Sequence, residues 1–188
     1  MPGPSSESRR TVRSQLGREV EGMAVRGSVP QPGLIVPHLV VRDTREALAY
    51  YERAFGATVL YRSPSPTGDG EHLHLKLWDS LVQVSSEEPA QQQRRVEGAL
   101  LAAPESLGGS TCVFQVSVPD VDAAYKRAVD EGGSPAIPPT TMFWGDRYGW
   151  LRDPFGHMWA LNQVQEVLTP EEVEQRMHNF AEEMRGRV

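Results

Sequence analysis

The apolar and polar residues of the first module form a strand-like apolar run that is followed by a helical pattern. The run Leu34–Val41 predicts a strand that ends close to Asp43. Asp43 with Glu46 three residues later is typical of a helix start, and Gly56 is typical of a helix end. The pattern therefore predicts a strand over 34–41 and a helix over 44–55.

The same pattern occurs a second time at a fixed offset. The run Thr111–Val118 predicts a strand, Asp120 a helix start and Gly133 a helix end. Asp43 and Asp120 are 77 residues apart, and so are Gly56 and Gly133. A period of this length indicates duplication of a supersecondary unit.

Each predicted helix is followed by three further strand candidates separated by Pro, Gly and Asp residues. They span 57–62, 72–78 and 81–85 in the first half, and 134–137, 147–151 and 157–162 in the second. The sequence thus predicts an α+β fold of two tandem βαβββ modules, 34–85 and 111–165, together one domain over 34–165. The linker 86–110 joins them, and a helical turn is expected at 96–102.

Both ends of the chain differ from the modules. Residues 1–33 carry five Arg and three Glu among Ser, Gly and Pro, which predicts a disordered extension of net charge +2. In the segment 166–188, Thr169 and Pro170 predict a helix start, and apolar residues then recur at helical spacing at Val173, Met177, Phe180, Ala181 and Met184. This amphipathic helix packs either on its own domain or across a dimer partner.

Composition excludes several classes of protein. The 188 residues are 39% hydrophobic, and no stretch approaches the ~18 consecutive apolar residues of a membrane span. A net charge of −6 disfavours nucleic-acid binding, for which basic domains are typical. With a single cysteine, Cys112, no internal disulfide forms, which favours a reducing cytoplasm.

Alternation along two strands sorts side chains to opposite faces. In 72–78, the three leucines share one face, expected against the helix, and His72, His74 and Trp78 share the other. In 111–118, Cys112 falls on the face expected to be buried, where it would be inert, and Gln115 falls on the opposite face.

The duplicated βαβββ pattern, together with the stretch from Trp144 to Trp159 that contains Asp153-Pro-Phe-Gly-His157, resembles the vicinal oxygen chelate superfamily. This superfamily includes glyoxalase I, bleomycin-resistance proteins and extradiol dioxygenases. The same stretch and Thr169-Pro-Glu-Glu resemble its PhnB-like branch. The resemblance implies a curved mixed sheet around a cleft and a homodimer. It also implies that Val36, His38 and Val40 face the cleft and that Ile35, Leu39 and Val41 face the helix.

The resemblance further implies where a metal ion would be held. The positions that match the metal ligands of metal-dependent relatives are Val36, Gln83, Val113 and Ala160. Three of these side chains have no donor atom, and Gln83 offers only a neutral amide. We therefore expect no metal and no cofactor. A noncanonical site of His38 with His72 or His74, completed by Asp146, is the alternative.

The expected ligand-binding residues share polar or aromatic side chains that face the cleft or its mouth. They are His38, His72, His74, Gln83, Gln115, Trp144, Asp146, Arg147, Tyr148 and Trp150. Arg147 would either hold an anionic or carbonyl group or form a surface ion pair. His157 and Trp159 are expected to be structural.

These observations lead to three hypotheses on function. The first is metal-independent binding of a small organic molecule, such as sequestration of a toxic compound or antibiotic. The alternative is an enzyme of the glyoxalase type, with the noncanonical metal site or with His72 or His74 as general base. The third is a protein-interaction module that docks through the C-terminal helix.

Overall fold

The computed structural model describes residues 35–65, 70–87 and 101–185. Its elements are β1 (His38–Val41), α1 (Thr44–Phe55), β2 (Thr58–Pro64), β3 (Glu71–Leu77), β4 (Ser80–Ser86), α2 (Pro104–Leu107), β5 (Val113–Ser117), α3 (Val121–Asp130), β6 (Ser134–Thr141), β7 (Asp146–Arg152), β8 (Met158–Val164) and α4 (Pro170–Arg185). The βαβββ order therefore occurs twice, as predicted. The expected tail at 1–33 lies outside the described residues, as does most of the expected turn at 96–102, whose last two residues are not helical.

The three long helices begin where the sequence predicts. The Asp43 carboxylate accepts hydrogen bonds from two backbone N–H groups of the first turn of α1, at 2.7 and 3.1 Å. Asp120 accepts one from Ala123 in the same way, at 2.9 Å. At α4, Thr169 and Glu172 each accept from the other's backbone N–H, which is a capping box. These side chains satisfy N–H groups that would otherwise lack partners.

The strands form two four-stranded sheets of equivalent order, β1-β4-β3-β2 and β5-β8-β7-β6. In each sheet the first strand pairs in parallel with the fourth, and the other neighbours are antiparallel. The duplication extends to register, because His38 pairs with Gln83 and, 77 residues later, Gln115 pairs with Ala160.

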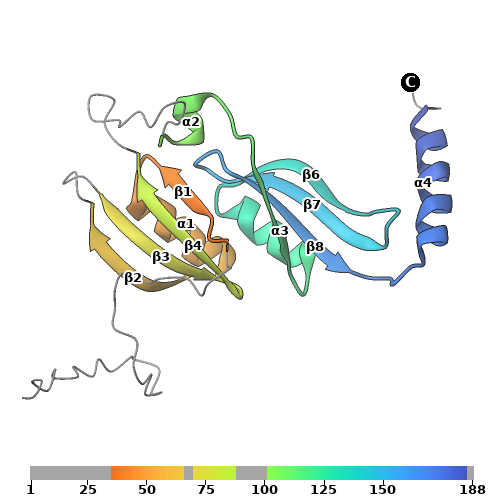
Figure 1. The fold of residues 1–188 in the computed structure, drawn as a ribbon, viewed down its shortest axis with the longest axis horizontal. Helices are drawn as coiled ribbons and strands as arrows, with labels where there is room; N and C mark the ends of the chain where they lie inside the picture. The colour runs from red at the N-terminus through yellow and green to blue at the C-terminus, as the bar shows by residue number, and fades with distance from the viewer. Residues whose placement is uncertain (1–34, 66–69, 88–100, 186–188) are drawn as a thin grey trace, which may run out of the picture. The chain divides into compact units, whose positions relative to one another are not determined.

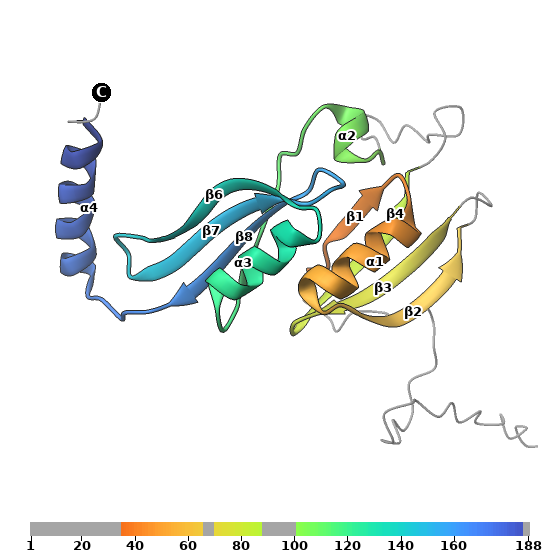
Figure 2. The same ribbon diagram turned by 180° about the vertical axis from the view of Figure 1, so that it is seen from behind.

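Each sheet is covered by a helix on one face. Figures 1 and 2 show α1 lying across the first sheet and α3 across the second, and no described helix covers the opposite face, which we call the open face of that sheet. The leucines of β3, predicted to face the helix, are buried against α1. Leu151 and Leu161 are buried beneath α3. Two expectations are wrong: Ile35 is 94% exposed and Cys112 is exposed, because each precedes the start of its strand.

A buried carboxylate joins the two modules. Asp153, in the turn before β8, accepts hydrogen bonds from the Tyr51 hydroxyl of α1 (2.8 Å) and from Trp159 Nε1 (2.9 Å). It also accepts from the backbone N–H groups of Phe155 and His157, each at 2.9 Å. His157 in turn donates from Nε2 to the Val40 carbonyl of β1 at 3.1 Å. The Asp-Pro-Phe-Gly-His motif is therefore structural here.

Helix α4 makes few contacts with the other described elements. Phe180 contacts Phe143 with ring centroids 5.7 Å apart, and Arg176 forms an ion pair with Glu166 at 2.7 Å. Met177 and Phe180 are 49% and 41% exposed, so the apolar stripe is only partly covered by the described residues. None of the helices in the described part of the chain has the length and apolar character needed to cross a membrane.

Candidate functional site: the open faces of the two sheets

One row of side chains crosses the whole open face of the first sheet. The register places His38 of β1 beside Gln83 of β4, Gln83 beside His74 of β3, and His74 beside Tyr61 of β2. His72 lies two residues from His74 on the same strand and therefore on the same face. The alternation within 72–78 predicted the two β3 histidines to share this face, and the strand order brings His38 near them.

The three histidines are in contact. His72 Nε2 and His74 Nε2 are 3.1 Å apart, a hydrogen bond in which one imidazole donates, and the rings of His38 and His72 have centroids 5.4 Å apart. His38 Nε2 also shares a hydrogen bond of 2.9 Å with Ser85 Oγ. Partial burial, and then the proximity of the other imidazoles, lower the pKa of His38 and of His74 below the usual 6.5.

The open face of the second sheet carries a line of aromatic rings. Tyr148 and Trp150 of β7 lie on this face, and Trp144 precedes the strand. The rings of Trp144 and Tyr148 have centroids 5.4 Å apart, and those of Tyr148 and Trp150 are 6.3 Å apart. Gln115 lies in the same row as Ala160 and Trp150.

Polar groups continue this second face. Asn162 of β8 donates to Asp146 Oδ2 at 3.3 Å and accepts from Ser117 Oγ at 3.1 Å. Three further polar residues of the open faces, Asn162, Ser85 and Tyr61, were not among those predicted from the sequence. The first two lie two positions beyond Ala160 and Gln83 on the same faces, so strand alternation was a sufficient signal. Tyr61 was hidden by the irregularity between Val59 and Tyr61 in β2.

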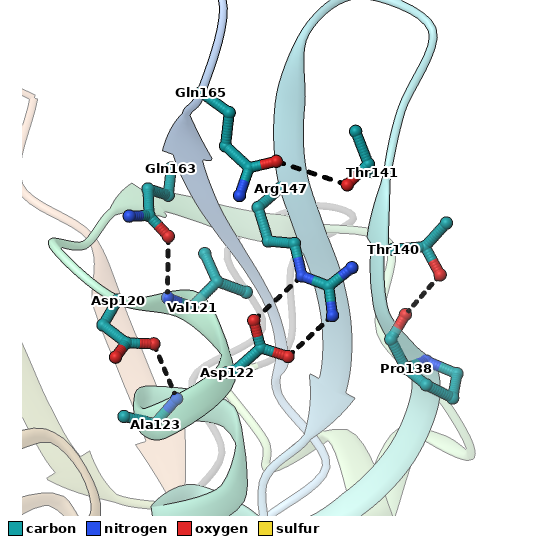
Figure 3. A network of polar contacts seen from close by, with 10 residues as sticks. All are labelled: Asp120, Val121, Asp122, Ala123, Pro138, Thr140, Thr141, Arg147, Gln163 and Gln165. Atoms are coloured by element: carbon teal, nitrogen blue, oxygen red, sulfur yellow. Dashed lines mark hydrogen bonds and ion pairs between the residues drawn. The ribbon is translucent and has the colours of Figure 1, made fainter.

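Arg147 lies on the other face and is not part of this set. Figure 3 shows its guanidinium against Asp122 of α3, with Nε and Nη2 donating to the two carboxylate oxygens at 2.9 and 2.7 Å. This bidentate contact lowers the pKa of Asp122 and raises that of Arg147. Of the two roles expected for Arg147, the structure shows the surface ion pair, and alternation along β7 turns Arg147 away from Asp146 and Tyr148.

The candidate residues thus form two groups, one on each sheet. His38, His72, His74 and Gln83 share the first open face, and Gln115, Trp144, Asp146, Tyr148 and Trp150 are on or beside the second. Two surface hollows are described, one beside α1 and one beside α2, and neither is lined by these residues. A cleft bounded by both open faces stays a prediction.

The side chains do not fit a metal ion at the positions that the resemblance implies. Gln83 and Ala160 lie in equivalent central strands, and of Val36, Gln83, Val113 and Ala160 only Gln83 has a donor. The alternative set is not assembled either, because Asp146 belongs to the other sheet from His38 and His72. Within the described residues, no group of three or more His, Cys, Asp or Glu is arranged to hold a metal ion.

Known proteins resemble this chain in sequence, and two solved structures also resemble it in fold. A protein of Mycobacterium tuberculosis is 36% identical over 141 residues, which are 75% of this chain and 80% of that protein. TioX from Micromonospora is 29% identical with a TM-score of 0.52, covering 69% of this chain and 96% of TioX. A gene product from Arabidopsis thaliana is 26% identical with a TM-score of 0.51, covering 68% of this chain and 96% of that one.

A family profile covers most of the chain. The profile described as the Glyoxalase/Bleomycin resistance protein/Dioxygenase superfamily matches residues 33–161. These residues include both modules except the end of β8, in agreement with the duplicated βαβββ structure. The chain therefore belongs to the glyoxalase/bleomycin resistance protein/dioxygenase superfamily, also called the vicinal oxygen chelate superfamily.

Proposed function

We propose that this protein binds a small organic molecule on the open faces of its sheets without using a metal ion as the binding group. The observation that carries the proposal is the line of rings Trp144, Tyr148 and Trp150 beside hydrogen-bonding groups on a face that no described helix covers. Aromatic faces with a few directed polar groups are typical of sites for organic ligands.

The composition of the second face defines the ligand class. Three rings in sequence favour a planar group, and Gln115 and the Asn162–Asp146 pair supply donors and acceptors around it. We propose a planar, polar compound, sequestered as a toxic molecule or antibiotic would be. The Trp144–Trp159 stretch supports placement in the PhnB-like branch.

We further propose that the protein acts in the cytoplasm as a homodimer. Exposed apolar side chains on the second sheet and α4 support self-association, among them Val113, Ile137, Met177 and Phe180. A second copy would cover these side chains and add walls to the open faces. Docking of a different protein on α4 ranks third among the candidate functions.

An enzyme that uses a histidine general base is the second candidate. The observation in its favour is the 3.1 Å contact between Nε2 of His72 and Nε2 of His74. The pKa of His74 is lowered, so its imidazole stays neutral and able to accept a proton at neutral pH. Turnover of a short 2-oxo compound that is lost in His74→Gln would establish this candidate.

Two neighbouring residues allow a matched test of ligand binding. In a thermal-shift screen over planar drugs, a ligand at about 100 times its Kd stabilises the folded state by about 2.7 kcal/mol. Tyr148→Leu, on the open face, is expected to lose this shift, whereas Arg147→Gln, on the opposite face, is expected to keep it. A shift that survives Tyr148→Leu and disappears in Arg147→Gln would contradict the proposal.

A further inference from the structure

The strand residues on the open face of the first sheet are mostly neutral or basic polar residues, and none of the described ones carries a carboxylate. Alternation and register place on it His38, Val40, Thr58, Tyr61, Ser63, His72, His74, Lys76, Leu81, Gln83 and Ser85. The neighbouring acids are paired with cations. Asp79, in the turn after β3, pairs with Lys76 of this face at 3.3 Å, and Glu87, just after β4, pairs with Arg42 at 3.7 Å. Glu71 is on the other face with Arg62 at 3.5 Å.

Three imidazole rings lie close together on this face. His72 contacts both His74 and His38, with ring centroids 5.1 and 5.4 Å apart, so a proton on one ring disfavours a proton on the next. An oxyanion beside the three rings would replace this repulsion with attraction. It would also accept hydrogen bonds from Ser85 and Gln83, which lie in the same two rows.

We propose that His38, His72, His74, Gln83 and Ser85, here called the histidine face, bind the oxyanion group of a small organic acid and take up protons in doing so. This inference rests on the proposed function, because it assigns a charged group to the ligand. The ligand group that fits this face is an oxyanion, either a carboxylate or a phosphonate. Anion binding of this kind differs from general-base catalysis, in which a histidine removes a proton from the ligand.

Proton uptake gives the proposal a quantitative signature. If one proton is taken up with the anion, affinity rises about tenfold for each unit by which the pH falls, as long as the protein without the anion does not itself bind that proton. Benzoate is a suitable probe, because a carboxyl group with a pKa near 4 stays ionised between about pH 7.5 and 5.5. Benzamide has nearly the same shape without the charge.

The test is calorimetric titration of the full chain with benzoate, phenylphosphonate and benzamide in buffers of different ionisation enthalpy. We expect benzoate, phenylphosphonate or both to bind. Benzoate binding should tighten at lower pH with uptake of about one proton per site, and benzamide should show no such dependence. Phenylphosphonate is compared with benzoate for affinity only, because its own second ionisation falls near this pH range. A preference between the two acids distinguishes a carboxylate from a phosphonate ligand. Binding of benzoate that does not change with pH, or no binding of either acid, would overturn the proposal.

Substitution of single histidines tests whether benzoate binds at the histidine face. His72→Gln and, as a second variant, His38→Asn are expected to weaken benzoate binding at pH 6 by about tenfold and to remove proton uptake. His178→Gln is the matched control, because His178 is an exposed histidine of α4. Equal benzoate affinity in His72→Gln, His38→Asn and His178→Gln, with the fold intact by circular dichroism, would refute the assignment.

A neutral planar drug from the thermal-shift screen distinguishes failure of this inference from failure of the proposed function. If the drug binds the wild type through Tyr148 but neither acid binds, the histidine face has no anion role and the proposed function stands. If neither drugs nor acids bind, both proposals fail.

Discussion

The hydrogen bond from Tyr51 to Asp153 joins the two modules, and its contribution to stability can be measured by removing a single oxygen atom. Tyr51→Phe removes the hydroxyl that α1 donates to Asp153 at 2.8 Å and keeps the ring. Asp153 is 2% exposed, and burial raises its pKa, whereas the four groups that donate hydrogen bonds to it favour the ionised carboxylate. Burial and the nearby Asp153 raise the pKa of Tyr51, so it remains a donor throughout the working range.

The magnitude follows from the charge of the acceptor. A hydrogen bond to a charged group contributes about 1.5–3 kcal/mol, whereas one between neutral groups contributes about 0.5–1.5 kcal/mol. Tyr50→Phe is the matched control, because the Tyr50 hydroxyl is also buried but donates to a neutral carbonyl, that of Ala128, at 3.2 Å. We expect Tyr51→Phe to lower the free energy of unfolding by about 2 kcal/mol and Tyr50→Phe by about 1 kcal/mol.

Urea unfolding followed by tryptophan fluorescence and by far-UV circular dichroism measures both variants. A shift of the midpoint with an unchanged slope reports a change in stability alone. Coincident transitions by the two probes show that the modules unfold together. If Tyr51→Phe costs no more than Tyr50→Phe, the Asp153 carboxylate does not hold α1 to the second module, and this part of the account is wrong.

Three further predictions concern backbone, pH and surface charge. Gly145→Ala should destabilise the protein by about 1–3 kcal/mol in urea unfolding and weaken planar-ligand binding through Trp144, because Gly145 has φ +96° and a Cβ would lie 2.6 Å from the Glu166 carbonyl oxygen. A free energy of unfolding unchanged by this substitution would exclude backbone strain there. Because the pKa of His74 is lowered on folding, the unfolded chain binds more protons near pH 6.5, so the wild type should lose stability as the pH falls through 6.5 and His74→Gln should lose less. Parallel pH profiles of the two proteins would contradict this. Arg147→Gln should lower Tm slightly at low salt and less at high salt, since the ion pair with Asp122 is exposed to solvent; a salt-independent effect would point to packing instead.

Local signals predicted most of the fold. The capping residues Asp43 and Asp120 located both module helices, and the 77-residue offset located the equivalent strands, because caps and alternation are set by neighbouring residues. Strand ends were less accurate. Ile35 and Cys112 continue apolar runs in the sequence but lie outside the hydrogen-bonded ladders, so neither is buried.

The candidate site was only partly predictable, because side chains meet across elements that the sequence does not align. Alternation placed His72 and His74 on one face, but the contact with His38 depends on the strand order β1-β4-β3. Arg147 shows the opposite problem, since its chemistry suits a ligand while α3 supplies Asp122 on its side of the sheet. The role of Asp153 as an acceptor for both modules depends on how α1 packs against the second module.

Metal content, measured together with ligand binding, decides whether this protein binds its ligand without a metal ion. The protein, purified without chelator, is analysed for zinc, nickel, iron and manganese, and binding of a planar drug is compared before and after chelator treatment. We expect metal well below one ion per chain and the same affinity in both samples. One ion per chain that is lost in the double variant His38→Ala, His72→Ala, together with loss of binding, would contradict this expectation.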